Sequence, residues 1–323
     1  MRRPSPRPSP RERGKGVALA ALLLAAALSA ACASAPARIA APPSPIDAAV
    51  DAGERHCSCR IGVAARHIES GLSFERNADQ EFESASVIKI AVLTEAMAGV
   101  REGRIDLAER WTLTDSRKAS ESGWLRFFDA GLAPTWNDLV TLMMGPSDNT
   151  ATNAWIERLG VDAINARMRS LGFERVRLFS LLPWLDPSVD GPKWRDLRFG
   201  VVTAREVADW YARVARGELL DAESSRKIFR YLDNAPSRAR IARRFSSAAL
   251  WLGKTGTMSG IRNDSGILRT GKGRFVLVVL TEGSPDVSDG APTHPAVTAM
   301  GDVARAIVDE WSRNLPDVPG QPQ

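Results

Sequence analysis

Three short motifs in this chain carry the residue types that acyl transfer requires. In chain order they are Ser86–Lys89 (SVIK), Ser147–Asn149 (SDN) and Lys254–Gly256 (KTG). Each is weak evidence alone, because such residues also suit ordinary turns and helix ends. Together they supply a nucleophilic hydroxyl, an amine base, a second hydroxyl and a cation that can hold an anionic substrate. The combination predicts covalent chemistry through a serine.

The first motif supplies the nucleophile and its base. Ser86 stands just before the apolar stretch 88–100, which predicts a buried helix. Lys89 follows by three residues, so we expect the two side chains to share a helix face. Burial and a nearby cation would lower the lysine pKa and leave a neutral amine to accept the serine proton. The segment 224–227 (SSRK) has the same spacing, but its polar flanks favour a surface role.

The second motif falls in a break between two predicted helices. We expect Ser147 to relay a proton to the leaving group and Asp148 to brace the loop. Asn149 would hold either a substrate amide or the Lys89 amine. The alternative is a simple turn and helix cap, which all three residue types favour.

The third motif ends an apolar strand. We expect Lys254 and Thr255 to bind an extended substrate along the strand edge, with the lysine supplying positive potential. Gly256 permits close approach because it has no Cβ atom. The N–H groups of Thr257 and Ser86 would then form an oxyanion hole. The alternative is a plain hairpin turn.

The elements that must position these motifs follow from hydrophobic periodicity, capping residues and turn residues. Predicted helices cover 46–54, 88–100, 135–144, 150–159, 203–217 and 295–315, and predicted strands cover 60–67, 72–76, 248–254, 265–268 and 275–281. Strands on both sides of a helical block usually pair into one antiparallel sheet. We therefore predict an α/β (α+β) fold of two subdomains: a five-stranded antiparallel sheet flanked by helices, and an all-helical subdomain. The cleft between them would collect the three motifs.

This motif set resembles that of class A β-lactamases and serine penicillin-binding proteins. The resemblance covers about residues 46–315 and extends beyond the three motifs to 60–65, 147–153 and 260–264. In the last segment, Arg262 is similar to an arginine that anchors the substrate carboxylate in this superfamily.

The resemblance implies a domain arrangement and a function. The sheet subdomain would comprise about 46–80 and 200–315, the helical subdomain about 81–199, and a tail 316–323. The implied function is an exported β-lactamase, active in antibiotic resistance, that opens β-lactam rings through a Ser86 acyl-enzyme. The expected partner is a small β-lactam or a peptidoglycan-like substrate, handled by a monomer without a cofactor.

One departure from the family pattern concerns removal of the acyl group. β-Lactamases of this family carry a water-activating Glu in a Glu-Pro-x-Leu-Asn run, whereas residues 182–186 here read LPWLD. Leu182 replaces the Glu and Asp186 replaces the Asn. Either deacylation is slow, or Asp186 positions or activates the water instead. The alternatives of a D-alanyl-D-alanine peptidase or esterase, and of a slowly deacylating penicillin sensor, therefore stay open.

The basic charge of the chain is confined to its N-terminal segment. Six of the 43 basic residues and one of the 38 acidic residues lie in 1–35, so the remainder carries 37 of each, which excludes a nucleic-acid-binding body. The basic start and the apolar run 17–33 predict a signal peptide over 1–35 and export to the periplasm or outer surface. Cys32 is an alternative lipidation site. An Ala/Pro-rich tether would cover 36–45.

The remaining cysteines and the histidines predict no metal centre. Cys57 and Cys59 would lie about 6.5–7 Å apart on one strand, beyond easy disulfide reach, so two packed thiols are favoured. The three histidines are scattered along the sequence without the spacing of metal ligands.

Overall fold

The α-helices and strands that the sequence predicts are all present in the predicted order. The computed structural model describes residues 44–186, 188–189, 198–233, 237–285 and 293–322. Its α-helices are α2 (Pro45–Cys57), α3 (Lys89–Arg101), α4 (Trp136–Met144), α5 (Asn149–Leu159), α6 (Val161–Ser170), α7 (Ala204–Arg216), α8 (Ala222–Asp233) and α9 (Pro295–Ser312). Its strands are β1 (Arg60–His67), β2 (Ser73–Arg76), β3 (Glu81–Glu83), β4 (Arg177–Leu178), β5 (Gly200–Thr203), β6 (Leu250–Met258), β7 (Ile261–Thr270) and β8 (Gly273–Glu282). Five of these elements are not predicted from the sequence: α6, α8, β3, β4 and β5.

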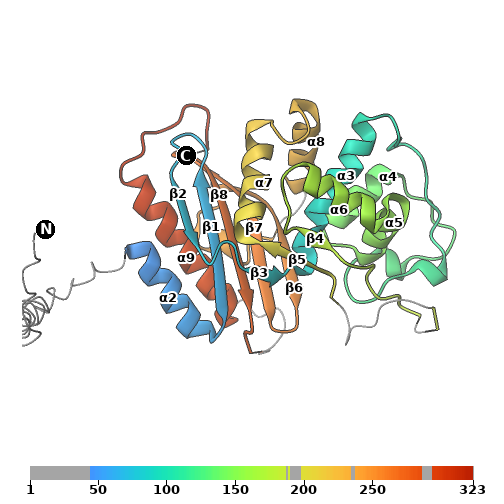
Figure 1. The fold of residues 1–323 in the computed structure, drawn as a ribbon, viewed down its shortest axis with the longest axis horizontal. Helices are drawn as coiled ribbons and strands as arrows, with labels where there is room; N and C mark the ends of the chain where they lie inside the picture. The colour runs from blue at the N-terminus through green and yellow to red at the C-terminus, as the bar shows by residue number, and fades with distance from the viewer. Residues whose placement is uncertain (1–43, 187, 190–197, 234–236, 286–292, 323) are drawn as a thin grey trace, which may run out of the picture. The chain divides into compact units, whose positions relative to one another are not determined.

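The main sheet has five antiparallel strands in the order β2-β1-β8-β7-β6. This confirms the predicted five-stranded sheet, in which β1 lies between its hairpin partner β2 and the C-terminal strand β8. Strand β6 lies at the edge and pairs with β7 so that Lys254 is opposite Ser265. The third motif therefore lies on an edge strand whose other side faces the helical layer (Figure 1).

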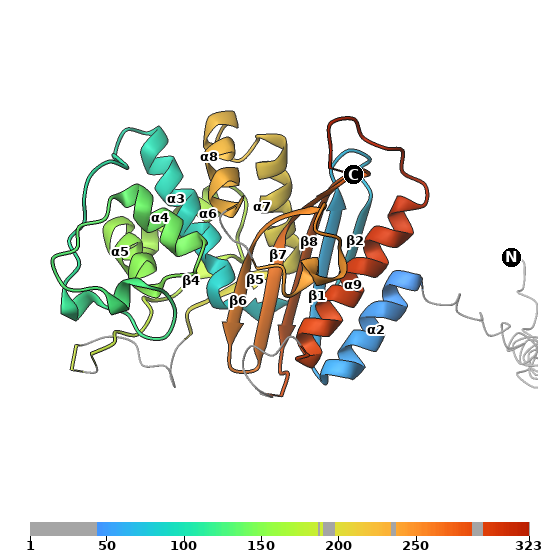
Figure 2. The same ribbon diagram turned by 180° about the vertical axis from the view of Figure 1, so that it is seen from behind.

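Helices cover both faces of this sheet (Figures 1 and 2). On one face α2 and α9 lie side by side and bury an apolar stripe that includes Val50, Met300 and Ile307, each 0% exposed. Helix α7 covers the other face, with Trp210 and Tyr211 fully buried. The apolar side chains of β8 alternate between the two cores, which explains why this strand reads as a continuous apolar run.

The helical layer is built around α3. Its residues from Lys89 to Gly99 are all buried, because α4, α5, α6 and α8 pack around it. This packing explains the apolar stretch that the sequence shows on every side of the helix. A second, three-stranded sheet of β3, β5 and β4 connects this layer to the main sheet.

Capping residues start two helices where the sequence predicts. Thr135 and Asp138 form a reciprocal capping box at α4. Thr203 caps α7 by accepting from the Glu206 N–H. Helices α6 and α8 are not apparent in the sequence, because each buries only a narrow stripe among polar residues. The buried residues of that stripe include Ile164 and Met168 in α6, and Ile228 and Leu232 in α8.

The prediction of free thiols at Cys57 and Cys59 is wrong, because these residues form a disulfide. The prediction assumed an extended strand through both residues. Instead, Cys57 ends α2 and Ser58 takes a left-handed conformation with φ 48°, which brings the two Cα atoms to 5.1 Å. That distance lies within the normal disulfide range.

The predicted signal peptide, Cys32 and nearly all of the tether lie outside the described residues. Among the helices that the structure describes, none combines the length and the apolar character needed to span a membrane.

Candidate active site

The nucleophile candidate stands on a strained turn. Ser86 belongs to a 3-10 helix, Ala85–Ile88, which leads directly into α3. Ala85 has φ 43°, a left-handed conformation that is costly for a residue with a Cβ atom. Strand β6 presses against this turn at Gly256, where an added Cβ would lie 2.8 Å from the Ser84 oxygen and 3.0 Å from the Ala85 Cβ. The predicted close approach at Gly256 is thus made by the protein's own backbone.

Lys89 lies beneath this turn and is completely buried. Its Nζ donates to the Ser147 carbonyl oxygen at 2.7 Å and to Asn149 Oδ1 at 3.1 Å, and it lies within hydrogen-bond distance of Ser147 Oγ, at 3.0 Å. Burial lowers the pKa of Lys89 well below its ordinary value, and the nearby charge of Lys254 lowers that pKa further. The lysine is therefore suited to act as a neutral base.

The Ser147 loop is held rigidly by its neighbour Asp148. Ser147 has φ 60°. The buried carboxylate of Asp148 accepts the N–H groups of Ala151 at 2.9 Å, Trp124 at 2.6 Å and Leu125 at 2.8 Å. These bonds confirm the bracing role predicted for Asp148 and fix the position of the Ser147 hydroxyl.

Lys254 reaches the same hydroxyl from the opposite side. It is 2% exposed, and its Nζ donates to Ser147 Oγ at 3.0 Å and to the Thr255 carbonyl oxygen at 3.0 Å. Burial, with the charge of Arg240 as the second cause, lowers the pKa of Lys254 to about 7. Burial likewise raises the pKa of Asp264 to about 7.

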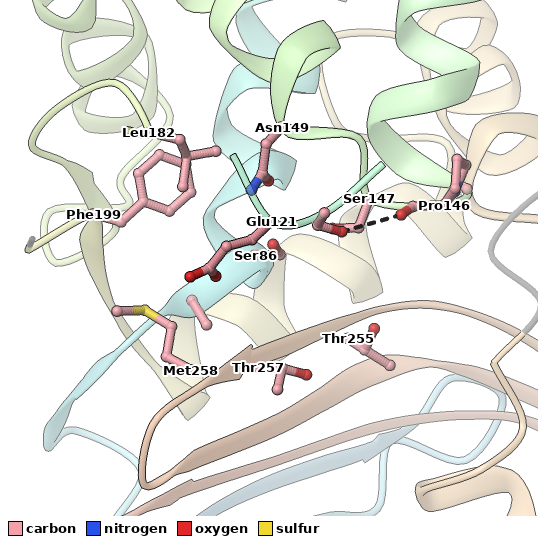
Figure 3. Close-up of a pocket in the computed structure, with 13 residues that line it drawn as sticks. Ser86, Glu121, Pro146, Ser147, Asn149, Leu182, Phe199, Thr255, Thr257 and Met258 are labelled. Carbon is pink, nitrogen blue, oxygen red and sulfur yellow. Dashed lines mark hydrogen bonds between the residues drawn. The ribbon is translucent and has the colours of Figure 1, made fainter. Parts of the chain in front are cut away.

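These groups border a pocket of about 440 Å³. Ser86, Ser147 and Asn149 line it from the helical side, and Thr255 and Thr257 line it from β6 (Figure 3). The remaining lining residues are Ala85, Glu121, Ser122, Gly145, Pro146, Leu182, Phe199 and Met258. The three predicted motifs therefore meet at one pocket, with both lysines beneath its surface.

Leu182 occupies a fixed place in this pocket wall. The Asn153 side chain donates to the Leu182 carbonyl oxygen at 2.9 Å and accepts the Leu182 N–H at 2.8 Å. The side chain is 4% exposed and presents only carbon to the pocket. At this position the wall offers no group that can activate water.

Two predicted site residues lie elsewhere. Asp186 is exposed, accepts from the Ser188 N–H at 2.8 Å and hydroxyl at 2.7 Å, and does not line the pocket. Arg262 is 2% exposed and donates to the carbonyl oxygens of Met258 and Ile261 at the β6–β7 turn. Its guanidinium thus braces that turn and is not part of the pocket wall described above.

Sequence reasoning misses two charged residues near the motifs. Arg240 donates to the carbonyl oxygens of Gly256 and Asn263, at 2.7 Å and 2.6 Å, and to the Thr257 hydroxyl. Glu121 lines the pocket. Both residues come from irregular segments without periodicity. For Glu121, the neighbouring residues Ser120 and Ser122 are typical of a loop, but they do not predict that the loop lies at the pocket.

The second Ser-x-x-Lys match is structural. Ser224 and Lys227 lie on α8, away from the pocket, and Lys227 pairs with Glu223 at 2.9 Å.

In the described part of the chain, no three His, Cys, Asp or Glu side chains are grouped to hold a metal ion.

The site as assembled can transfer an acyl group to a serine hydroxyl, which is the chemistry of serine hydrolases that act on amides. The sequence comparisons agree. A family model described as "Beta-lactamase enzyme family" matches residues 45–311. The chain belongs to this family and is a serine β-lactamase-like hydrolase.

Individual relatives lie at moderate distance. The chain is 29% identical to Beta-lactamase SME-1 of Serratia marcescens over 227 residues, covering 68% of this chain and 74% of that protein. It is 25% identical to Beta-lactamase regulatory protein BlaB of Streptomyces cacaoi, and the match covers 76% of this chain and 92% of that protein. The crystal structure of a β-lactamase from Sphaerobacter thermophilus matches with 30% identity and a TM-score of 0.72, covering 84% and 99%. The predicted two-subdomain fold is thereby confirmed.

Proposed function

We propose that Ser86 opens the β-lactam ring and is acylated, with Lys89 as its base. A neutral Lys89 amine takes the serine proton while Ser86 Oγ bonds to the ring carbonyl carbon. The N–H groups of Ser86 and Thr257 bind the resulting oxyanion. As the ring C–N bond breaks, Ser147 passes its proton to the ring nitrogen and is reprotonated by the Lys89 ammonium. Water then hydrolyses the ester in a second stage.

The observation that carries this proposal is the shared hydrogen bonding of Ser147. Its Oγ lies 3.0 Å from the Nζ atoms of both Lys89 and Lys254, beside the pocket that Ser86 lines. The hydroxyl is thus within hydrogen-bond distance of the base and of the cation that would hold the substrate carboxylate. Arg240, bound to the Thr257 hydroxyl, adds positive charge at that end of the pocket.

A second candidate function is favoured by Leu182. With an apolar side chain where a water-activating carboxylate is expected, the acyl-enzyme would persist, as in a penicillin-binding sensor or a peptidase of D-alanyl-D-alanine ends. The similarity to a protein named as a β-lactamase regulator is compatible with this function. We keep Asp186 as the alternative carboxylate, although its exposed position argues against direct action.

One experiment separates these functions. Purified protein is mixed with a chromogenic cephalosporin, and the colour change is followed over many enzyme equivalents. Steady turnover supports the β-lactamase. A single stoichiometric burst supports the sensor, and no reaction directs the search to peptides or esters.

We also propose that the protein is exported and acts as a monomer. The basic and apolar leader supports export. The two routes are removal of the signal peptide by cleavage, and lipidation at Cys32. Cell fractionation and the intact mass of the mature protein would distinguish cleavage from lipidation, and an unprocessed cytoplasmic chain would contradict export. Sedimentation would test the monomer.

A further inference from the structure

Asn263 joins the strained turn that carries Ser86 to the main sheet. The asparagine is 0% exposed and stands on β7 directly opposite Gly256 of β6. Its side-chain Nδ2 donates to the carbonyl oxygen of Glu83 at 2.9 Å and to that of Ser84 at 3.2 Å. One buried amide therefore binds the backbone of the two residues that lead into the turn.

The partners of this amide fix its orientation. Asn263 Oδ1 accepts the Thr281 N–H of β8 at 3.0 Å, while both hydrogens of Nδ2 face carbonyl oxygens, which can only accept. A reversed amide would set its oxygen against these carbonyl oxygens. Since both amide hydrogens are used within the protein, the Asn263 side chain links parts of the chain and does not present a donor to a substrate.

The turn is also in contact with β6. An added Cβ on Gly256 would lie 2.8 Å from the Ser84 oxygen and 3.2 Å from the Ser86 nitrogen. The turn contains Ala85 at φ 43°, a costly conformation that persists only where the surroundings hold it. Contact at Gly256 limits how closely the turn approaches the strand, and the two hydrogen bonds from Asn263 limit how far it moves away. The spacing between turn and strand is thus set from both directions.

This spacing matters for the proposed oxyanion hole. Its two N–H groups come from separate parts of the chain, Ser86 in the turn and Thr257 in β6. Oxyanion donors act when each lies about 2.7–3.1 Å from the oxygen, so a small change in their separation removes one of them from reach. Arg240 reinforces the same place, because it donates to the carbonyl oxygens of Gly256 at 2.7 Å and of Asn263 at 2.6 Å.

We infer that Asn263 is a positioning residue that holds the two halves of this oxyanion hole at their working distance. The inference rests on the proposed acylation of Ser86 and adds a residue on which the rate of that step depends. Asn263 acts through the turn and touches no reacting atom. Because negative charge on the oxygen develops only as the Ser86 bond forms, loss of Asn263 should slow the chemical step and leave the binding of intact substrate unchanged.

The test separates binding from chemistry. Rapid mixing with benzylpenicillin, followed by mass spectrometry, gives the dissociation constant of the first complex and the first-order rate constant of acylation at saturation. Asn263→Asp keeps the shape of the side chain and the acceptor for Thr281, but it replaces the Nδ2 donor by an oxygen. Asn263→Ala, which has no polar side-chain atom, is the second variant.

Asn165→Asp is the matched control. Asn165 Nδ2 donates to the Leu178 carbonyl oxygen and its Oδ1 accepts the Leu178 N–H, both at 2.8 Å, and it lies outside the pocket lining. The substitution therefore removes a comparable donor at a place that does not touch the turn.

We expect the acylation rate constant to fall at least about tenfold in both Asn263 variants, with the dissociation constant within about twofold of wild type, and Asn165→Asp to change neither. Phenylboronic acid bonds to a serine hydroxyl as a tetrahedral adduct that resembles the transition state. Its affinity should fall by about the same factor as the rate constant. Because the rate constant is first order, partial unfolding lowers the labelled fraction without altering the rate.

An unchanged rate constant in a labelled Asn263 variant, equal losses in rate and binding, or a slower rate without loss of boronic acid affinity would overturn the inference. Gly256→Ala enlarges the same spacing from the side of β6 and should give the same pattern, so it decides the question if neither Asn263 variant folds. An unchanged rate constant there also counts against the inference. If benzylpenicillin does not label wild type, the proposed function fails instead.

Discussion

Lys89 and Lys254 meet through one hydroxyl group, because the Nζ atom of each lies 3.0 Å from Ser147 Oγ. Lys89 has two further acceptors, the carbonyl oxygens of Ser147 and of the Asn149 side chain, which cannot donate. These two oxygens satisfy both hydrogens of a neutral amine. The lone pair of Lys89 is then available for a hydroxyl, which is the state that the proposed acylation needs.

Replacing Ser86 by Ala should abolish covalent labelling by benzylpenicillin, because it removes the hydroxyl that lines the pocket on the strained turn, three residues before the buried Lys89. Turnover of any hydrolysed substrate should fall by at least about a thousandfold. Intact-mass analysis measures the label, and circular dichroism checks the fold. Labelling that persists in a folded Ser86→Ala protein would disprove the nucleophile assignment.

The pH dependence of acylation should be bell-shaped. The neutral fraction of Lys89 grows as pH rises through its lowered pKa, so the rate rises on the acid side. The charge of Lys254 is lost as pH rises through about 7, so binding of an anionic substrate weakens on the alkaline side. The second-order acylation rate reports both limbs. In Lys254→Arg the alkaline limb should move to higher pH, because a guanidinium keeps its charge; an unmoved limb would assign it to another group.

Leu182→Glu should shorten the life of the acyl-enzyme. It places a carboxylate in the pocket wall at the point where Leu182 presents only carbon. General-base assistance contributes about 10²–10⁴ in favourable geometry, and we expect at least about tenfold faster deacylation. The lifetime is measured by mass spectrometry after removal of free penicillin. Leu182→Gln is the control for size and polarity, and an equal gain in both variants would rule out base catalysis.

Asp186→Ala tests the alternative carboxylate. Its side chain accepts from Ser188 and stands outside the pocket lining, so we expect deacylation to change by less than about twofold, as at surface positions generally. The same lifetime measurement applies. A trapped acyl-enzyme would restore Asp186 to the role that the sequence suggested for it.

Two asparagines provide a matched pair for stability. Asn153 binds both main-chain groups of Leu182, and Asn165 binds both of Leu178, with distances of 2.8–2.9 Å. Changing either one to Ala leaves an N–H and a C=O unpaired, so each variant should lose about 2 kcal/mol or more of unfolding free energy. Urea unfolding measures this loss. Only Asn153→Ala should also alter acylation, because only Leu182 lines the pocket; equal kinetic effects would indicate a general loss of structure.

The sequence predicted the main sheet and the candidate catalytic groups that meet at the pocket because both depend on local patterns. Apolar runs mark β8 and α3, and the three motifs contain their own chemistry. What it could not predict depends on tertiary contacts. The position of Glu121 at the pocket requires a turn held by Asn149, and the place of Arg240 requires a loop that passes behind β6. The Cys57–Cys59 bond depended on a single left-handed residue between them.

The same locality limits what the sequence says of Arg262, whose substrate-binding role stays a prediction. Its neighbours in the sequence match a strand that follows the third motif, and the strand is present as β7. Its guanidinium, however, donates to the carbonyl oxygens of Met258 and Ile261 at the β6–β7 turn. A family pattern identifies such a residue type without stating what its side chain contacts.

The place of β1 in the sheet has a consequence for folding. This early strand pairs with β8, so Gly62 meets Leu280 only after most of the domain has been synthesised. The bond between Ser147 and Lys254 spans 107 residues, whereas the bond between Lys89 and Ser147 spans 58. Contacts of such high sequence separation form late and make folding slow. Penicillin labelling would therefore report completion of the whole sheet, and pulse labelling during refolding would time the closure of the last long-range contacts.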